Sequence, residues 1–373
     1  MIIRQITDAI KADYGNGKVI VISGPRQVGK TTLLDQLTAG RKSVLRFNGD
    51  DYDDAEKLTR RTSTELRQMV SGYEMVVIDE AQRIENIGLT LKMLADLKLD
   101  IQFVVTGSSS LDLANKINEP ATGRLLEYRL FPFSTGEMVA DTDERTEKRL
   151  LEMRMIFGFY PEVVVKPKDA KRLLANVSNS YLFKDLLGYK GLKKPAVLQK
   201  LVRALALQVG SEVSFNELSN LIGIDRATVE NYINLLEQCY IIFHLDSYSN
   251  NQRNEIKKGK KFYFHDIGVR NALINNYSPM DLRQDTGAMW ENFVIVERMK
   301  KLANGQRYVN FYFWRSLTQQ EVDLVEEEDG QLRAYEFKWN AAKKAKQPSG
   351  FAANYPDTPF EVVTPENYLE FVL

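Results

Sequence analysis

The chain has 373 residues, more than a single hydrophobic core usually serves, so we expect two or three domains. Its 50 basic and 50 acidic residues cancel, which excludes a global field that steers the whole protein to nucleic acid or membranes. The one cysteine, Cys239, excludes an intrachain disulfide framework and fits a reducing compartment. Because the N-terminus lacks a signal-peptide pattern and no apolar run reaches membrane-spanning length, we expect a cytoplasmic protein without a membrane partner.

A glycine-rich segment at residues 24–31 has the form G-x-x-x-x-G-K-T. It follows a short β-branched run at residues 19–22 and precedes an expected helix, which is the context of a phosphate-binding loop. In such a loop backbone N–H groups point at phosphate oxygens, the lysine reaches the β and γ phosphates, and the threonine hydroxyl ligates Mg²⁺. A plain glycine-rich turn would give no reason for Lys30 and Thr31. The pattern therefore predicts that ATP and Mg²⁺ are bound by Gly24, Pro25, Arg26, Gln27, Val28, Gly29, Lys30, Thr31 and Thr32.

Acidic residues follow the next two expected strands. The first of these strands ends before Asp50 and Asp51, which either approach the Mg²⁺ through water or lie in a solvated turn. Residues 74–78 predict a buried strand that leads into Asp79 and Glu80. Because buried strands rarely end in paired acids without a cation to balance them, we assign Asp79 to the Mg²⁺ shell and Glu80 to the activation of the attacking water.

Two further polar groups are candidates for the nucleotide site. The expected strand at residues 101–106 ends in a hydroxyl cluster, from which Thr106 or Ser108 contacts the γ-phosphate or the water, unless the cluster caps the next helix. Arg124 precedes an expected strand at residues 125–130. It is a candidate charge stabiliser, acting in cis or from a neighbouring subunit, or else a surface arginine.

These motifs resemble those of a large prokaryotic family of AAA-type P-loop ATPases. The resemblance is carried by the G-x-R-Q-V-G-K-T loop, by I-D-E-x-Q at residues 78–82, by T-G-S-S at residues 106–109, and by Gly123-Arg124 followed by F-P-F-S at residues 131–134. It implies an AAA-type ATPase domain at residues 1–140, followed by a poorly characterised C-terminal region. Residues 141–194 have a helical pattern and resemble the linker of that family.

Residues 195–275 have the pattern of a winged helix. An apolar helix at residues 195–207 is followed by a capping box of Ser214 and Glu217, and a turn at residues 223–225 separates two expected helices. Apolar residues share one face of the second helix, and two strands joined by a basic loop come next. The apolar face consists of Val229, Ile233 and Leu236, the strands span residues 240–245 and 261–265, and the basic residues are Arg253, Lys257, Lys258 and Lys260.

A winged helix usually suggests DNA binding, and two interpretations stay open here. In the first, the second helix enters the major groove and the basic loop contacts phosphate. The base-reading candidates are Arg226, Thr228, Asn231 and Asn234. In the second, the winged helix is a protein-interaction or autoinhibitory module. Glu230 and Glu237 count against DNA contact, because they place negative charge on or near that helix. His244 and His265 lie on apolar strands, where satisfied core histidines are a better interpretation than metal ligands.

The last expected domain, residues 276–373, contains a helix at residues 287–299 and strands at residues 310–315, 321–325 and 331–339. Alternation along the last two strands places Asp323, Glu336 and Lys338 on one surface, with Tyr335, Phe337 and Trp339 on the opposite face of their strand. Two carboxylates can hold a divalent cation such as Mg²⁺, and a lysine beside them can orient or deprotonate water.

This arrangement resembles the D-x(n)-E-x-K signature of restriction-endonuclease-like nucleases. The resemblance implies that Asp323 and Glu336 are metal ligands, that Lys338 is catalytic, and that Glu291 on the helix is an outer acid. The alternative from the residues alone is a solvated strand face on which Glu336 and Lys338 form an ion pair.

Together these observations predict an α/β protein with an N-terminal P-loop NTPase, a helical linker, a winged helix and a restriction-nuclease-like domain. We expect an ATPase that couples ATP·Mg²⁺ to DNA binding and to the nuclease-like domain, in DNA defence or processing. The alternative is a non-cleaving, ATP-dependent switch that docks DNA or a protein, and a homo-oligomer is an open expectation.

Overall fold

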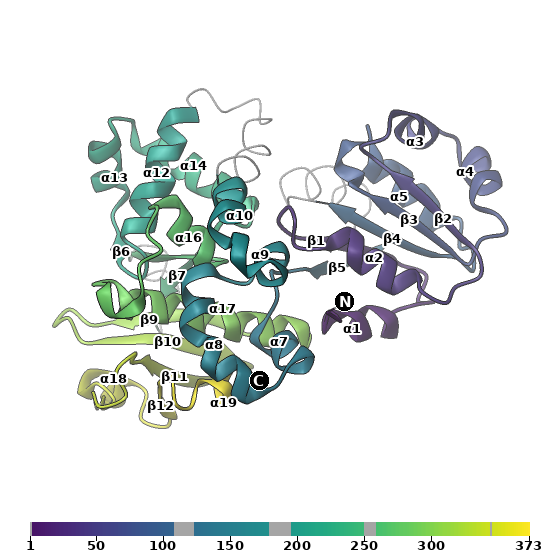
Figure 1. Ribbon diagram of the computed structural model, residues 1–373. Coiled ribbons are helices and arrows are strands. Elements are labelled where there is room, and N and C mark those ends of the chain that lie inside the picture. Colours follow the sequence, from purple (N-terminus) through teal and green to yellow (C-terminus); the bar gives the residue numbers. More distant parts are fainter. Residues whose placement is uncertain (1, 108–122, 179–194, 250–258, 344) are drawn as a thin grey trace. The chain divides into compact units, whose positions relative to one another are not determined.

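The computed structural model describes residues 2–107, 123–178, 195–249, 259–343 and 345–373. Its chain divides into two compact units, one of residues 1–132 with 238–240, the other of residues 133–237 with 241–373 (Figure 1). The first boundary lies at Pro132, a few residues before the boundary expected at residue 140. No helix in the described ranges is long and apolar enough to cross a membrane.

The N-terminal unit contains a parallel sheet of five strands within the described part of the chain, in the order β2-β3-β4-β1-β5. These strands are β1 (Val19–Ser23), β2 (Val44–Asn48), β3 (Met75–Asp79), β4 (Gln102–Gly107) and β5 (Leu125–Arg129). The central strands are continuous apolar runs because both of their faces are covered. All the strands predicted for this unit are confirmed, with ends shifted by one or two residues.

Helices cover both faces of this sheet. They are α1 (Ile6–Ala12), α2 (Lys30–Thr38), α3 (Tyr52–Leu58), α4 (Ser63–Val70) and α5 (Ile87–Asp96), with the short helix η1 (Ala81–Arg83) after β3. One core cluster joins Val19 and Val21 of β1 to Leu66 of α4 and Leu91 of α5. The alternate residue Ile20 is equally buried, because successive strand side chains point to opposite faces and α2 contacts β3 and β4.

The second unit is built on a mixed sheet, which has seven strands in the described ranges, in the order β12-β11-β10-β9-β7-β8-β6. The strands are β6 (Glu212–Val213), β7 (Ile242–Ser247), β8 (Lys260–Phe264), β9 (Asn310–Arg315), β10 (Glu321–Glu328), β11 (Gln331–Phe337) and β12 (Phe360–Val363). Strand β7 pairs in parallel with β9, so one sheet crosses the boundary expected at residue 275. Strands β9, β10 and β11 form an antiparallel meander, and β12 joins β11 in parallel.

The helices of this unit include the predicted helices at residues 195–207 and 287–299 and the two helices on either side of the predicted turn at residues 223–225. They are α7 (Thr135–Asp141), α8 (Glu144–Phe157), α9 (Pro161–Val165), η2 (Pro167–Asp169), α10 (Ala170–Asn176), α12 (Pro195–Leu207), α13 (Phe215–Ile222), α14 (Arg226–Gln238), α16 (Ile267–Leu273), η4 (Met280–Leu282), α17 (Thr286–Asn304), α18 (Ser349–Asn354) and α19 (Tyr368–Val372). Helix α17 contacts both β11 and β8, and Trp290 on it is fully buried. The predicted alternation on β11 is confirmed, because Tyr335 and Phe337 both contact the Phe371 ring at a tilt while Ala334 packs with Trp314 on the other face.

Candidate functional site

The phosphate-binding loop connects β1 to α2 through a tightly curled backbone. Gly29 precedes α2 with a φ of 92°, a left-handed conformation that favours glycine. A Cβ at Gly24 would lie 2.2 Å from the carbonyl oxygen of Leu130, so no larger residue fits there. The buried ammonium of Lys30 donates hydrogen bonds to the carbonyl oxygens of Gly24 and Pro25, both at 2.9 Å. The loop therefore has the backbone shape that a phosphate cradle requires.

Asp79 is the centre of a polar network beside this loop. Its carboxylate accepts hydrogen bonds from the Thr31 hydroxyl at 2.7 Å, from the Thr106 hydroxyl, and from the backbone N–H of Glu80 at 3.1 Å. The strand order explains why Thr31, Asp79 and Thr106 lie together. Strand β4 lies between β1 and β3, so its end carries Thr106 between the phosphate loop and Asp79. A carboxylate and a hydroxyl held this close are ligands of the kind that Mg²⁺ prefers.

Glu80 adopts an unusual backbone conformation, with a φ of 49°. Such a left-handed conformation costs a non-glycine residue roughly 1–3 kcal/mol and is concentrated at functional sites. The side chain of Gln82 donates a hydrogen bond to the Glu80 carboxylate at 2.5 Å, and the Glu80 N–H is 3.2 Å from the Thr106 hydroxyl. Gln82 thereby fixes the position of the Glu80 carboxylate, and the Glu80 backbone is tied to Asp79 and Thr106.

The structure places Arg124 away from the nucleotide loop. Its carbonyl oxygen accepts a hydrogen bond from Val19 N, at the start of β1, whereas the loop follows the end of β1. Five residues of strand, about 16 Å, separate these two edges of the sheet. The Arg124 side chain pairs instead with Asp96 at 2.6 Å. In this structure Arg124 therefore lies apart from the phosphate loop, and its action as a charge stabiliser, in cis or from a neighbouring subunit, stays a prediction.

Asp50 and Asp51 have local structural partners. Asp51 caps α3 by accepting hydrogen bonds from the N–H groups of Asp53 and Asp54, and Asp50 pairs with Arg83 at 3.4 Å. Both aspartates are exposed, as in the solvated-turn interpretation. Ser108, the other sensor candidate, lies outside the described residues.

Arg4 is a residue of this site that the sequence analysis missed. Its buried guanidinium donates hydrogen bonds to the carbonyl oxygens of Val28 at 2.8 Å and of Phe131 at 2.6 Å. Arg4 thus links the phosphate loop to the segment directly before the unit boundary at Pro132. The signal in the sequence was weak, one cation next to the apolar residues Ile2, Ile3 and Ile6.

The second candidate site lies on the β10–β11 hairpin. A two-residue turn of Asp329 and Gly330, both at positive φ, joins the strands and fixes their register. Asp323 accepts a hydrogen bond from the backbone N–H of Phe337 at 2.8 Å, and Lys338 pairs with Glu336 at 2.5 Å. A β-bulge between Val322 and Val325 shifts the pairing with β9 around Asp323. The hairpin therefore brings Asp323, Glu336 and Lys338 together.

A buried lysine from β8 lies among the acids of this site. Lys261, which is 2% exposed, pairs with Glu291 of α17 at 3.1 Å and with Glu321 of β10. The Tyr263 hydroxyl also donates a hydrogen bond to Glu291, at 2.6 Å. We name Lys261, Glu291, Glu321, Asp323 and Glu336 the acidic cluster. Neither Lys261 nor Tyr263 was singled out from the sequence, where they are merely alternate residues of an expected strand.

The electrostatics of the acidic cluster reflect burial and crowding. Burial raises the pKa of Asp323 well above its ordinary value, and the charges of Glu291 and Glu336 raise it further, while Lys261 opposes both. Burial lowers the pKa of Lys261, but Glu291 and Glu321 more than compensate, so the ammonium stays charged. Among the described residues, no three His, Cys, Asp or Glu side chains are arranged to hold a metal ion. The carboxylates of the cluster are balanced instead by ammonium groups, with Lys261 beside Glu291 and Glu321 and Lys338 beside Glu336.

Around α13 and α14, several of the predicted DNA-contacting groups are already engaged. Arg226 pairs with Glu230 at 2.8 Å, the Thr228 hydroxyl bonds to Asp225 at 2.7 Å, and Lys260 pairs with Asp246 at 3.4 Å. Asn231 and Asn234 are exposed. Arg253, Lys257 and Lys258 lie outside the described residues.

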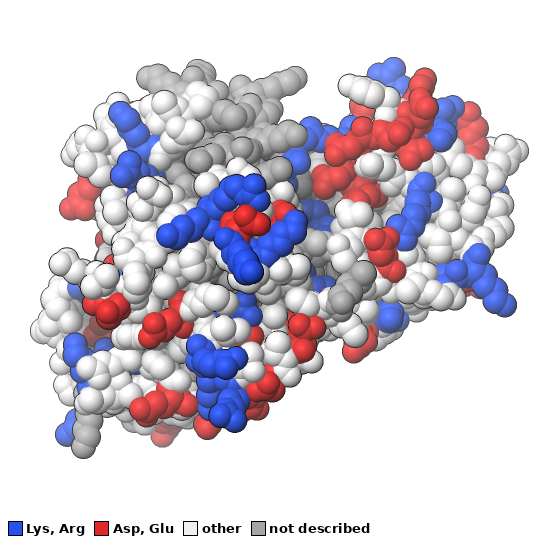
Figure 2. Space-filling view, viewed as in Figure 1, with Lys and Arg blue, Asp and Glu red and all other residues white. Residues whose placement is uncertain are grey.

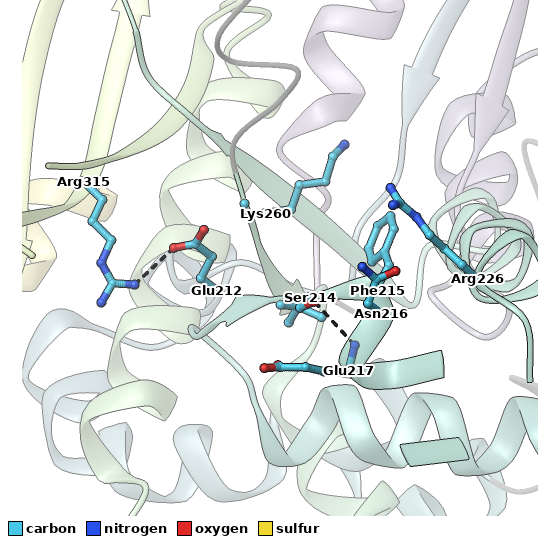
Figure 3. A pocket seen from close by; sticks show the side chains of 10 residues that line it. Glu212, Ser214, Phe215, Asn216, Glu217, Arg226, Lys260 and Arg315 are labelled. Carbon is cyan, nitrogen blue, oxygen red and sulfur yellow. Dashed lines mark hydrogen bonds and ion pairs between the residues drawn. The ribbon is translucent and has the colours of Figure 1, made fainter. Parts of the chain in front are cut away.

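A cavity of about 530 Å³ opens between the start of α13, the start of α14 and the start of β8 (Figure 3). Charges of both signs line it, and the pair of Arg315 and Glu212 is marked in Figure 3 by a dashed line. Their nearest charged atoms are 3.1 Å apart. Ser214 accepts a hydrogen bond from Glu217 N at 3.4 Å, which is one of the two bonds of the predicted capping box. The face seen in Figure 2 likewise carries both basic and acidic side chains.

The two histidines differ from each other. His265 is buried and stacks on Phe243 with ring centroids 4.8 Å apart, as expected of a core histidine. His244 lies instead in a charged network, with Nε2 3.5 Å from Asp246 and Nδ1 bonded to Glu237. Burial lowers the pKa of His244, but Asp246 and Glu237 outweigh burial and the nearby Lys260 ammonium, and raise it to about 9.

Three family models match successive parts of the chain. The model described as "AAA domain" matches residues 16–139, and two models described as domains of unknown function match residues 148–279 (DUF8612) and 286–369 (DUF4143). The N-terminal unit is therefore a P-loop ATPase domain of AAA type, which binds ATP.

Individual relatives are similar over most of the chain. An uncharacterized protein of Mycobacterium tuberculosis is 26% identical over 326 residues, covering 86% of this chain and 70% of the relative. An uncharacterized protein of Haemophilus influenzae is 24% identical over 302 residues, covering 75% and 74% respectively. Among solved structures, a Walker-type ATPase of Pyrococcus abyssi is similar with a TM-score of 0.49 and 15% identity, covering 73% of this chain and 96% of that chain.

Proposed function

We propose that the protein is an ATP-hydrolysing switch whose second unit contacts DNA. The observation that carries the proposal is the network in which Asp79 joins Thr31 of the phosphate loop to Thr106 and Glu80. It assembles a metal-binding carboxylate, a hydroxyl, a polar sensor and a candidate base in one place. These are the groups that hydrolysis of a nucleoside triphosphate requires.

The residues present fit ATP and Mg²⁺. Backbone N–H groups of residues 24–32 would hold the phosphates, and Thr31 and Asp79 would hold the metal ion. The bound nucleotide supplies the phosphoanhydride bond, and its Mg²⁺ neutralises developing charge. Lys30 exchanges the carbonyl oxygens of Gly24 and Pro25 for phosphate oxygens, and Glu80 accepts a proton from the attacking water.

Coupling to the second unit requires that ATP bind two arrangements of the protein with different affinity. Arg4 offers a hydrogen-bonded route for this coupling, because its guanidinium binds both Val28 of the loop and Phe131, which directly precedes Pro132. A change in the loop backbone would alter the anchor of the chain that enters the second unit.

DNA contact is supported by the order of elements around α14. The sequence of elements is α12, β6, α13, α14, β7 and β8, with β6 and β7 both paired to β8, as in a winged helix. Val229, Ile233 and Leu236 of α14 are buried, so the helix has one packed face and one outer face. The outer face carries Arg226, Asn231 and Asn234, which are exposed and have the chemistry to read base edges.

The test of the switch is fluorescence-anisotropy titration of labelled duplex DNA with and without ATP. We expect nucleotide to change the affinity of the wild type, Lys30→Ala to abolish that change, and Arg226→Glu to weaken binding at every salt concentration. Arg203→Glu, an exposed change on α12, is the matched charge-reversal control and should bind as the wild type does. DNA affinity equal for Arg226→Glu and Arg203→Glu would refute the assigned surface, and identical affinity with and without ATP would refute the switch.

Metal-dependent DNA cleavage is the second candidate function. It is favoured by the element order α17-β9-β10-β11-α18-β12, which resembles that of restriction-endonuclease-like nucleases, and by the juxtaposition of Asp323, Glu336 and Lys338. The test is incubation of supercoiled and linear DNA with Mg²⁺ or Mn²⁺, with and without ATP. Scission that Lys338→Ala removes, and whose ATP dependence Lys30→Ala removes, would establish a coupled nuclease. If ATP binds but nothing is cut, the protein is a non-cleaving switch that docks DNA or a protein partner.

A further inference from the structure

The acidic cluster already contains a cation supplied by the chain itself. The Lys261 ammonium lies 3.1 Å from Glu291 and in direct contact with Glu321, and its side chain is 3% exposed. Because a buried charge must be paired, the sheet has placed an ammonium where carboxylates from α17 and β10 converge. The second compact unit alone provides all these groups.

Each carboxylate of the cluster is also engaged by a donor from the protein. Glu291 accepts hydrogen bonds from Lys261 and from Tyr263, Glu321 lies 3.4 Å from Arg315 as well as beside Lys261, and Lys338 pairs with Glu336. Asp323 accepts from the backbone N–H of Phe337 at 2.8 Å. A divalent cation needs carboxylate oxygens of this kind as ligands, and here those oxygens already have donors from the protein.

We propose that Lys261 supplies the positive charge that a divalent cation would bring to this acidic cluster, so that the cluster is a metal-independent structural centre. The inference rests on the restriction-endonuclease-like interpretation of the hairpin, and it favours the non-cleaving function over the cleaving one. Removal of the ammonium leaves Glu291 and Glu321 without their shared counter-charge, and the vacated space lies beside Asp323. A variant without Lys261 should therefore acquire a metal site that the wild type lacks.

The experiment is a Mn²⁺ titration followed by electron paramagnetic resonance, on nucleotide-free full-length protein. All samples carry Asp79→Asn, so that the nucleotide site does not contribute ions. We expect Lys261→Met to tighten Mn²⁺ binding at least about tenfold, and addition of Asp323→Asn to remove the gain. Lys261→Arg, which keeps the charge, should show no gain. Lys260→Met, on the neighbouring residue of β8, is the matched control and should also show none.

Thermal denaturation provides a second readout in case Lys261→Met folds poorly. Mn²⁺ should raise the melting temperature of Lys261→Met, or of the charge-balanced pair Lys261→Met with Glu321→Gln, by more than it raises that of the control. The proposal is overturned if these folded variants gain no Mn²⁺ affinity. It is also overturned if the protein with Lys261 intact binds Mn²⁺ tightly through Asp323 and Glu336. Either result leaves ATP-dependent DNA binding untouched, so failure of this inference and failure of the switch are distinguishable.

Discussion

Replacement of Thr106 by valine tests the nucleotide site directly. Thr106 is fully buried, and its hydroxyl donates to the Asp79 carboxylate and accepts from Glu80 N at 3.2 Å. Valine keeps nearly the same shape but removes both hydrogen bonds. The bond to the ionised carboxylate is worth about 1.5–3 kcal/mol, and each 1.4 kcal/mol of lost transition-state stabilisation lowers the rate about tenfold. We therefore expect kcat for ATP hydrolysis to fall about 10- to 100-fold.

The assay is steady-state ATP hydrolysis, in which a coupled enzyme reaction measures the ADP that is released. KM for ATP should change little, because Thr106→Val leaves the backbone of the phosphate loop intact. Thr106→Ser, which keeps the hydroxyl, is the control and should retain most of the activity. A folded Thr106→Val protein with wild-type kcat would refute the role assigned to the hydroxyl that joins Asp79 to Glu80.

Three further predictions concern stability and pH. Gly24→Ala should lower the melting temperature and abolish ATP binding, because its Cβ would lie 2.2 Å from a carbonyl oxygen; a stable variant that still binds ATP in calorimetry would contradict this. Arg298→Met breaks a buried bidentate pair with Glu326, with bonds of 2.7 and 2.9 Å, and should lower the free energy of unfolding in urea by about 3–5 kcal/mol. The control Arg307→Met breaks an exposed pair with Glu328 and should lower it by under about 1 kcal/mol. Equal losses would refute the argument from burial. The pKa of His244 is raised from 6.5 to about 9, so its stabilisation is complete below pH 6.5 and is lost as the pH rises to about 9. Unfolding free energy should fall by roughly 2–3 kcal/mol over that window, and the fall should be absent in His244→Gln.

Short-range patterns in the sequence located the elements that carry the candidate nucleotide site. The positions of Lys30, Thr31 and Asp79 follow from strand-loop-helix patterning, and the structure places the Thr31 hydroxyl within hydrogen-bonding distance of Asp79. Such patterns can do this because a parallel sheet gathers the carboxyl ends of its strands at one edge. The same rule placed Thr106 at that edge.

Patterns of this kind could not locate residues whose role depends on distant segments. Arg4 reaches Phe131 across 127 positions of sequence, and Lys261 reaches Glu321 across 60. Arg124 precedes its strand, so it lies at the amino edge of the sheet, and its motif alone did not show that position. The β-bulge at Asp323 also has no local signature in the sequence.

By itself the sequence determined the elements, the phosphate loop and the acids that follow β3, because backbone propensity, apolar periodicity and glycine conformation act over a few residues. Only the tertiary structure decided which strands are neighbours, that β7 continues the sheet into β9, and that the acids of the second unit surround an ammonium. The physical reason is that buried charges are balanced by whatever group the fold brings into reach, and that group need not be near in sequence.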